Sequence, residues 1–223
     1  MRKTLFSGIA ACLLATAATA AEQSPSVIWT VGQADRSASE FALAPDRFRD
    51  FLANDFGYED KYFLVGHSVP AADFPYVLPG PADTWGGTWP TSGWRTHQVN
   101  ILFGLKEIPS DGTCTLVVDL LDYAKNFLPL VKVSVNTQDA KFQLDAPGLS
   151  VADQRKPNQM EKIVDTLSIT GNLAKATPRR LEIPIRPGVL KAGGNEVTIT
   201  VLEGSWILFD RVSLEGPAGT NVE

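Results

Sequence analysis

The 223-residue chain has only two cysteines and two histidines, and both shortages restrict the chemistry that it can perform. Cys12 lies in an N-terminal apolar run, so a chain cleaved after that run keeps Cys114 alone and forms no internal disulfide. Cys114 opens an apolar stretch without a basic neighbour, which predicts a packed side chain rather than a catalytic thiol. His67 and His97 show no HxH or HxxxH spacing, which argues against a zinc site.

Positive charge is also scarce. Of the 20 basic residues, Arg2 and Lys3 precede the apolar run, and removing them leaves 18 basic against 25 acidic side chains, a net charge of −7. A chain with this charge has no electrostatic basis for binding nucleic acid or an anionic membrane. We therefore expect neither partner.

No apolar run is long enough to span a membrane. Residues 5–17 are mainly apolar but too short for a transmembrane helix. They follow the basic start Met1-Arg2-Lys3 and precede the small residues Ala18-Thr19-Ala20, which together predict a signal peptide over residues 1–20. We expect export to the periplasm or the extracellular space, and a mature chain of residues 21–223 that forms one domain without linkers or repeats.

Helical patterns are rare, whereas short alternating strands are common. Residues 27–31 and 62–66 are rich in β-branched and aromatic residues and end at glycine. Residues 97–103 alternate, with His97, Val99, Ile101 and Phe103 on one face and Gln98 and Asn100 on the other, so His97 should be a core residue. Further strands are predicted at 116–121, 131–135, 181–185 with Pro184 indicating a sheet edge, 197–201 and 206–214.

One short helix is predicted from Pro45, with Phe48, Phe51, Leu52 and Phe56 at helical spacing and Gly57 after them. Residues 160–173 fit either a helix or a strand. The pattern as a whole favours an all-β fold, an antiparallel β-sandwich with one or two short helices.

A segment rich in aromatic residues, proline and glycine interrupts the strands. Residues 68–93 should form a long surface loop that carries Phe74, Tyr76 and several tryptophans. Trp29 and Trp206 lie in predicted strands and should be core residues. The tryptophan segment, residues 83–95, instead leads directly into the strand at 97–103, an arrangement typical of a recognition surface mounted on a scaffold.

Several of these pieces occur in the order found in a known family. They are residues 28–35 with Glu40-Phe41, residues 62–66 with 73–76, residues 97–103, residues 133–136, residues 183–195 and residues 204–210. This set resembles the C-terminal domain of rhamnogalacturonan lyases of polysaccharide lyase family 4. The resemblance implies a jelly-roll sandwich of the galactose-binding-like kind that binds carbohydrate.

In that family the lyase reaction belongs to a separate N-terminal domain, and Ile28 follows the predicted signal peptide too closely to leave room for one. We therefore expect a non-catalytic module that binds a poly- or oligosaccharide and serves a separate polysaccharide-degrading enzyme. Two alternatives stay open: a lyase acting alone, and a structural or assembly module. His67, Lys61 and Arg95 are nominal lyase candidates, but nothing in their spacing supports that role.

Sugar binding requires flat aromatic surface and planar polar groups that form paired hydrogen bonds with hydroxyls. The tryptophan segment and the strand after it supply both, and Arg95 suits a uronate carboxylate. The predicted carbohydrate-binding residues are Asp83, Trp85, Trp89, Trp94, Arg95, Gln98 and Asn100. The alternative for the tryptophans is a lid packed on the sandwich.

The resemblance also implies a structural calcium. Modules of the galactose-binding-like kind often hold one in a loop after the first strand, where this chain has Asp35 and Glu40. Asp119, Asp122 and Asp210 are similar candidates. The alternative is that these carboxylates cap turns.

Overall fold

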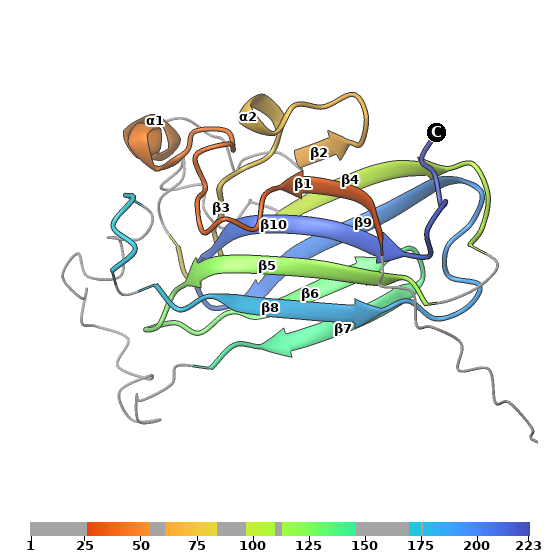
Figure 1. The fold of residues 1–223 in the computed structure, drawn as a ribbon. Helices are drawn as coiled ribbons and strands as arrows, with labels where there is room; N and C mark the ends of the chain where they lie inside the picture. The colour runs from red at the N-terminus through yellow and green to blue at the C-terminus, as the bar shows by residue number, and fades with distance from the viewer. Residues whose placement is uncertain (1–25, 54–60, 84–96, 110–112, 146–169, 175) are drawn as a thin grey trace, which may run out of the picture.

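The computed structural model describes residues 26–53, 61–83, 97–109, 113–145, 170–174 and 176–223, and these residues form two β-sheets packed face to face (Figure 1). The predicted all-β sandwich is confirmed. The predicted signal peptide and most of the tryptophan segment lie outside the described residues. So do residues 160–169, which are most of the segment 160–173 that fits either a helix or a strand.

We call the first layer sheet I. Its strands, in spatial order, are β1 (Ser26–Gly32), β10 (Ile207–Gly216), β5 (Thr115–Tyr123) and β8 (Arg179–Pro184), and β3 (Val77–Leu78) pairs with β10 beside them. All of these pairs are antiparallel. β5 lies between two strands and is buried on both faces, whereas β8, which contains Pro184, is an edge strand, as the sequence predicts.

We call the second layer sheet II. It runs β2 (Lys61–Leu64), β4 (Gln98–Leu105), β9 (Gly193–Glu203), β6 (Leu130–Val135) and β7 (Gln138–Gln143). β2 and β4 are parallel, so sheet II is mixed at this pair, whereas its other strand pairs are antiparallel as predicted. β7 was not predicted because its sequence, QDAKFQ, lacks a continuous alternation of β-branched residues.

The core lies between the sheets and contains the predicted inward rows, including Val99, Ile101 and Phe103 of β4. His97 does not extend this row, because it precedes β4 at a φ of 47° and is half-buried. Trp29 packs on Phe103 with 5.2 Å between ring centroids. Trp206 is also buried, so both strand tryptophans are core residues as predicted.

Residues 68–83 are not one continuous surface loop, because residues 74–80 are buried, which corrects the prediction for this part of the segment. They contain α2 (Pro70–Asp73) and β3, and Phe74 and Tyr76 are completely buried. The Phe74 ring lies 5.1 Å from that of Phe209, and the Phe209 amide donates to the Tyr76 carbonyl at 2.9 Å. Aromatic burial and backbone pairing together hold this proline-rich segment inside the fold.

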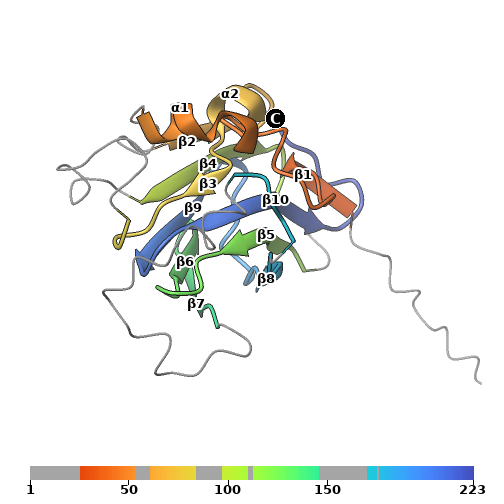
Figure 2. The ribbon, with the colours of Figure 1, turned by 90° about the vertical axis from the view of Figure 1, so that its left-hand side faces the viewer.

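The remaining elements agree with the sequence. A single 3₁₀ turn (Pro45–Arg47) leads into α1 (Phe48–Ala53) at the predicted helix start (Figure 2). Cys114 is a free, buried thiol, and burial raises its pKa, as befits a packed residue. Within the described ranges, no helix is both long and apolar enough to cross a membrane.

Candidate functional site

The outer face of sheet II, which points away from the core, carries two of the predicted site residues. Along β4, Val99, Ile101 and Phe103 point inward, so Gln98 and Asn100 share the opposite face. β9 lies antiparallel beside them and places Thr200 opposite Gln98 and Thr198 opposite Asn100. Four polar side chains from two strands therefore meet on one surface.

These four residues, which we call the polar ladder, are joined by hydrogen bonds. Gln98 Nε2 donates to Asn100 Oδ1 at 3.2 Å, and Thr198 Oγ1 donates to the same oxygen at 2.9 Å. The Thr200 hydroxyl lies 3.4 Å from Gln98 Oε1. The bonds hold the two amide groups in fixed orientations, a requirement for selective recognition of hydroxyl groups.

Asn100 has an unused donor. Its side chain is 1% exposed, yet Nδ2 has no hydrogen-bond partner among the residues that the structure describes. A buried amide donor without a partner costs about 1–3 kcal/mol of folding free energy. The amide therefore lies beneath the outer surface, and the half-buried Gln98, Thr198 and Thr200 are the members of the group that a ligand can reach.

An exposed aromatic ring borders the polar ladder. Tyr62 on β2 pairs in register with Asn100, is 56% exposed, and points outward because its neighbour Phe63 is in the core. A phenol ring in this position offers a flat apolar surface beside planar amides. Sequence reasoning missed Tyr62, Thr198 and Thr200, because their proximity to Asn100 depends on strand pairing rather than on sequence spacing.

Charged residues occupy the far side of the same face, on β6 and β7. Lys132 lies directly opposite Lys141, and its ammonium is 3.2 Å from the Asp139 carboxylate. A hydrogen bond from Ser134, helped by one from Lys132, lowers the pKa of Asp139. Because Lys132 and Lys141 outnumber Asp139, these three residues give this side of the face a net positive charge.

Asp83, predicted to contact sugar, is instead buried at the base of the tryptophan segment. Its Oδ2 accepts from the Gly80 amide at 2.7 Å, and its Oδ1 accepts from the Ser205 hydroxyl at 2.5 Å. These bonds attach the segment to the turn between β9 and β10. Asp83 is therefore a buried anchor of the segment rather than a surface residue.

The other end of the tryptophan segment is attached close by. The Val201 amide, on β9 next to Thr200, donates to the His97 carbonyl at 3.0 Å. Asp83 and His97, the described residues on either side of 84–96, therefore both contact the same end of β9 and the turn after it. Trp85, Trp89, Trp94 and Arg95 lie outside the described residues, so their predicted roles stay predictions.

Asp35 and Glu40, the predicted calcium ligands, lie in the loop after β1 and accept backbone hydrogen bonds. Asp35 Oδ1 accepts from the Ser37 amide and Glu40 Oε1 from the Gln33 amide, both at 2.9 Å. Among the described residues, no cluster of three or more His, Cys, Asp or Glu side chains is placed to hold a metal. Each carboxylate keeps a second oxygen, so the calcium prediction stays open.

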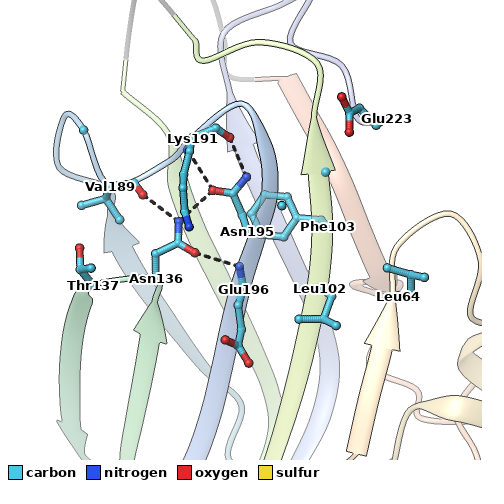
Figure 3. A pocket seen from close by; sticks show the side chains of 13 residues that line it. Leu64, Leu102, Phe103, Asn136, Thr137, Val189, Lys191, Asn195, Glu196 and Glu223 are labelled. Carbon is cyan, nitrogen blue, oxygen red and sulfur yellow. Dashed lines mark hydrogen bonds between the residues drawn. The ribbon is translucent and has the colours of Figure 1, made fainter.

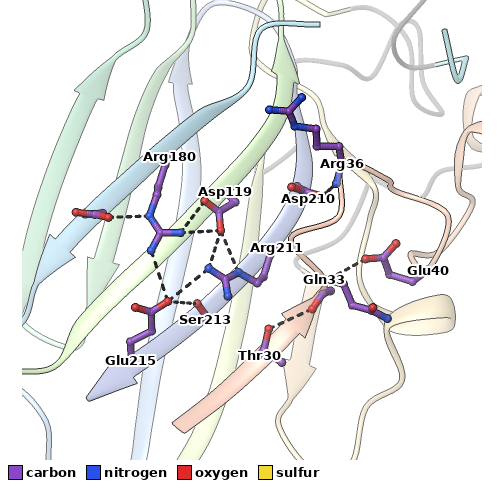
Figure 4. A network of polar contacts seen from close by, with 12 residues as sticks. Thr30, Gln33, Arg36, Glu40, Asp119, Arg180, Asp210, Arg211, Ser213 and Glu215 are labelled. Atoms are coloured by element: carbon purple, nitrogen blue, oxygen red, sulfur yellow. Dashed lines mark hydrogen bonds and ion pairs between the residues drawn. The ribbon is translucent and has the colours of Figure 1, made fainter. Parts of the chain in front are cut away.

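Asp210, another calcium candidate, fixes the same loop. It is buried at an irregularity of β10, and its Oδ1 accepts from the Arg36 amide at 3.0 Å, where Arg36 has a φ of 64° (Figure 4). Burial raises the pKa of Asp210 to about 6. Asp122, at the end of β5, bonds to Lys125 and to the Thr177 amide.

The outer face of sheet I carries a different polar group, an ion-pair network (Figure 4). Asp119 contacts Arg211 at 2.9 Å and Arg180 at 3.2 Å. Both arginines approach Glu215, at 3.4 and 3.5 Å, and Arg180 also reaches Glu182 at 2.7 Å. These charges pair with one another, so the network indicates structural stabilisation rather than a site.

Comparison with known proteins gave one family match. The sequence model described as "CBM-like: Polysaccharide lyase family 4, domain III" matches residues 27–214. The search of curated proteins found no matching relative.

Two solved structures are weakly similar to this chain. One is a family GH115 4-O-methyl-α-glucuronidase with specificity for decorated arabinogalactans, at 17% identity and a TM-score of 0.31 over 52% of this chain. The other is dimeric latent PorU from Porphyromonas gingivalis, at 10% identity and a TM-score of 0.30 over 56% of this chain. The matches span 13% and 10% of those chains.

Proposed function

Because the chain belongs to the CBM-like family, domain III of polysaccharide lyase family 4, we propose that it is an exported, non-catalytic module that binds a poly- or oligosaccharide. In this proposal the module holds a glycan such as rhamnogalacturonan while a separate polysaccharide-degrading enzyme acts on it. Family membership supports a carbohydrate-related role, and the details of binding rest on the outer face of sheet II.

The observation that carries the proposal is the polar ladder beside Tyr62. The ladder supplies the half-buried amide of Gln98 and the half-buried hydroxyls of Thr198 and Thr200, which hydrogen bonds within the ladder hold in place. Tyr62 supplies exposed aromatic surface at the same level of the sheet. Sugar rings present hydroxyls around their edges and C–H groups on their faces, so this combination suits them.

The tryptophan segment extends the same site in our proposal. Asp83 and His97 anchor its two ends at the end of β9 that carries Thr200. Trp85, Trp89 and Trp94 would add apolar surface, and Arg95 would pair with a sugar carboxylate. This assignment rests on residue type and on the positions of the anchors.

Affinity electrophoresis with the folded protein tests the proposal. We expect retardation in gels that contain rhamnogalacturonan and none with cellulose. Tyr62→Ala, Trp85→Ala and Trp94→Ala should each reduce retardation, whereas Val27→Ala, at an exposed position on sheet I, should not. Normal migration in every glycan tried, with calcium present, would contradict the proposal.

The same glycan distinguishes binding from catalysis. We expect no ultraviolet absorbance from unsaturated uronic ends when the protein is incubated with rhamnogalacturonan. A steady rise in absorbance would instead show a lyase acting alone.

Calcium and export belong to the proposal as well. If Asp35 and Glu40 hold a structural calcium, adding calcium should raise the melting temperature of the native chain. The melting temperature of the Asp35→Ala variant should not change when calcium is added. Equal melting temperatures in calcium and in a chelator would assign both carboxylates to turn capping alone. Export predicts a mature protein that begins at Ala21.

A further inference from the structure

A groove of about 720 Å³ lies on the outer face of sheet II, beyond the polar ladder (Figure 3). Leu64, Leu102 and Glu196 lie side by side on β2, β4 and β9, because Leu64 pairs with Leu102 and Leu102 with Glu196. Lys191 and Thr137 line it from the loops above. No function proposed so far uses these residues.

Two asparagines build the wall of the groove that contains residues 188–195. Asn136 Nδ2 donates to the Val189 carbonyl at 2.7 Å and to Asn195 Oδ1 at 2.8 Å. Asn195 Oδ1 also accepts from the Lys191 amide, and its Nδ2 donates to the carbonyls of Lys191 and Gly193. The asparagine amides are thus fully used in holding the loop, so the groove is formed before any ligand arrives.

The floor is apolar and the rim is charged. Leu64 is 43% exposed although it lies on a strand, and Leu102 beside it is half-buried. Gly194 adds no side chain, and a Cβ built there would meet no atom within 4 Å. Glu196 and Lys191 are exposed, and neither makes an ion pair within the described part of the chain.

The groove and the polar ladder are parts of one strip. Gln98, Asn100, Leu102 and Gly104 follow one another on the same face of β4, opposite Thr200, Thr198, Glu196 and Gly194 of β9. At about 3.3 Å per residue, the strip from Gln98 to Gly104 is about 20 Å long. A polymer that contacts the ladder and continues along the strands enters the groove.

We propose that the groove is the second half of the ligand site, and that a glycan lies along β4 and β9 from the ladder into it. The unit in the groove is a neutral sugar: its apolar face rests on Leu64 and Leu102, and its hydroxyls donate to the Glu196 carboxylate. Glu196 and Glu223 together outnumber Lys191, so a uronate is disfavoured there. This inference depends on the proposed carbohydrate binding.

Calorimetric titration with short and long rhamnogalacturonan oligosaccharides tests the inference. We expect the long oligosaccharide to bind the native chain more tightly than the short one. Glu196→Gln should weaken the long oligosaccharide about tenfold and Leu64→Ala about three- to tenfold, because one loses a charge-assisted hydrogen bond and the other an apolar platform. Neither change should affect the short oligosaccharide held by the ladder.

Matched controls are Glu107→Gln and Val27→Ala, which alter exposed residues outside the groove. Binding by the native chain with unchanged affinity in both groove variants would overturn the groove assignment and leave the proposed function intact. If the groove variants bind short and long oligosaccharides with equally reduced affinity, the groove does not hold the additional units of the long oligosaccharide, and the inference is overturned. No binding by the native chain would overturn the proposed function and this inference together.

Discussion

The outer faces of the two sheets are both polar, but they use their polar groups in opposite ways. On sheet I, Asp119, Arg180, Arg211 and Glu215 neutralise one another at distances from 2.9 to 3.5 Å. On sheet II, the polar ladder orients its amides and leaves the Nδ2 donor of Asn100 without a partner among the described residues. Tyr62 and Leu64 remain exposed beside it.

This difference separates polar residues that stabilise the fold from polar residues that can bind a ligand. Groups that satisfy one another contribute to stability and have little left for a ligand. Groups that are fixed and still partly exposed, such as Gln98, Thr198 and Thr200, contribute less to stability and can bind a ligand. Substitutions on sheet I should therefore change the free energy of unfolding, and substitutions on sheet II should change affinity.

The largest effect should come from Asp119→Ala. Removing this carboxylate leaves Arg180 and Arg211 close together with reduced compensation, and the Asp119 side chain is only 12% exposed. We expect the free energy of unfolding to fall by about 2 kcal/mol in urea denaturation, with glycan affinity unchanged. Glu182→Ala, at a 57% exposed side chain, is the control and should cost less than about 0.5 kcal/mol. Similar losses in both variants would refute the structural role of Asp119.

Tyr62→Ala should give the reverse result. Loss of the exposed ring should lower affinity for the retarding glycan about tenfold, because an aromatic platform contributes about 1 kcal/mol or more. The free energy of unfolding should change by less than about 0.5 kcal/mol. Tyr62→Phe, which keeps the ring, should retain most of the affinity in the same titration. A stable but fully binding Tyr62→Ala variant would remove Tyr62 from the site.

Asp210→Asn should change how stability depends on pH. The folded-state pKa of Asp210 is raised to about 6, so the native state takes up a proton there before the unfolded state does. This group therefore adds stability as the pH falls through 6, about 1 kcal/mol between pH values of about 7 and 5. Urea denaturation at the two pH values should show this gain in the native chain and not in Asp210→Asn. An identical pH dependence in both would mean that Asp210 does not titrate in this range.

The smallest effect should come from Thr198→Val. The variant keeps the shape of the side chain but removes the hydroxyl that donates to Asn100 Oδ1 at 2.9 Å. We expect a loss of about 0.5–1 kcal/mol in the free energy of unfolding and about threefold in affinity, since the amide is less firmly oriented. Thr200→Val removes a longer contact of 3.4 Å and should have a smaller effect on both measurements. A larger effect of Thr200→Val would reverse this order.

Sequence reasoning located part of the candidate site. Alternation along residues 97–103 placed Gln98 and Asn100 on the face opposite the core, and the structure has them there. Thr198 and Thr200 lie about a hundred positions away and reach the ladder only through the β4–β9 register. Asp83 was grouped with the tryptophans by proximity in the sequence, but its partners are Gly80 and Ser205.

The sequence by itself determined the all-β class, the inward rows and the burial of Trp29, Trp206 and Cys114, because each follows from local alternation of apolar residues. Tertiary structure alone decided the parallel β2–β4 pair, the burial of Phe74 and Tyr76, and the groove beside Leu64. These features depend on contacts between residues distant in the chain, and local patterns do not specify such contacts. The candidate site depends on both: sequence alternation predicts the face on which Gln98 and Asn100 lie, and strand pairing brings the other residues of the site beside them.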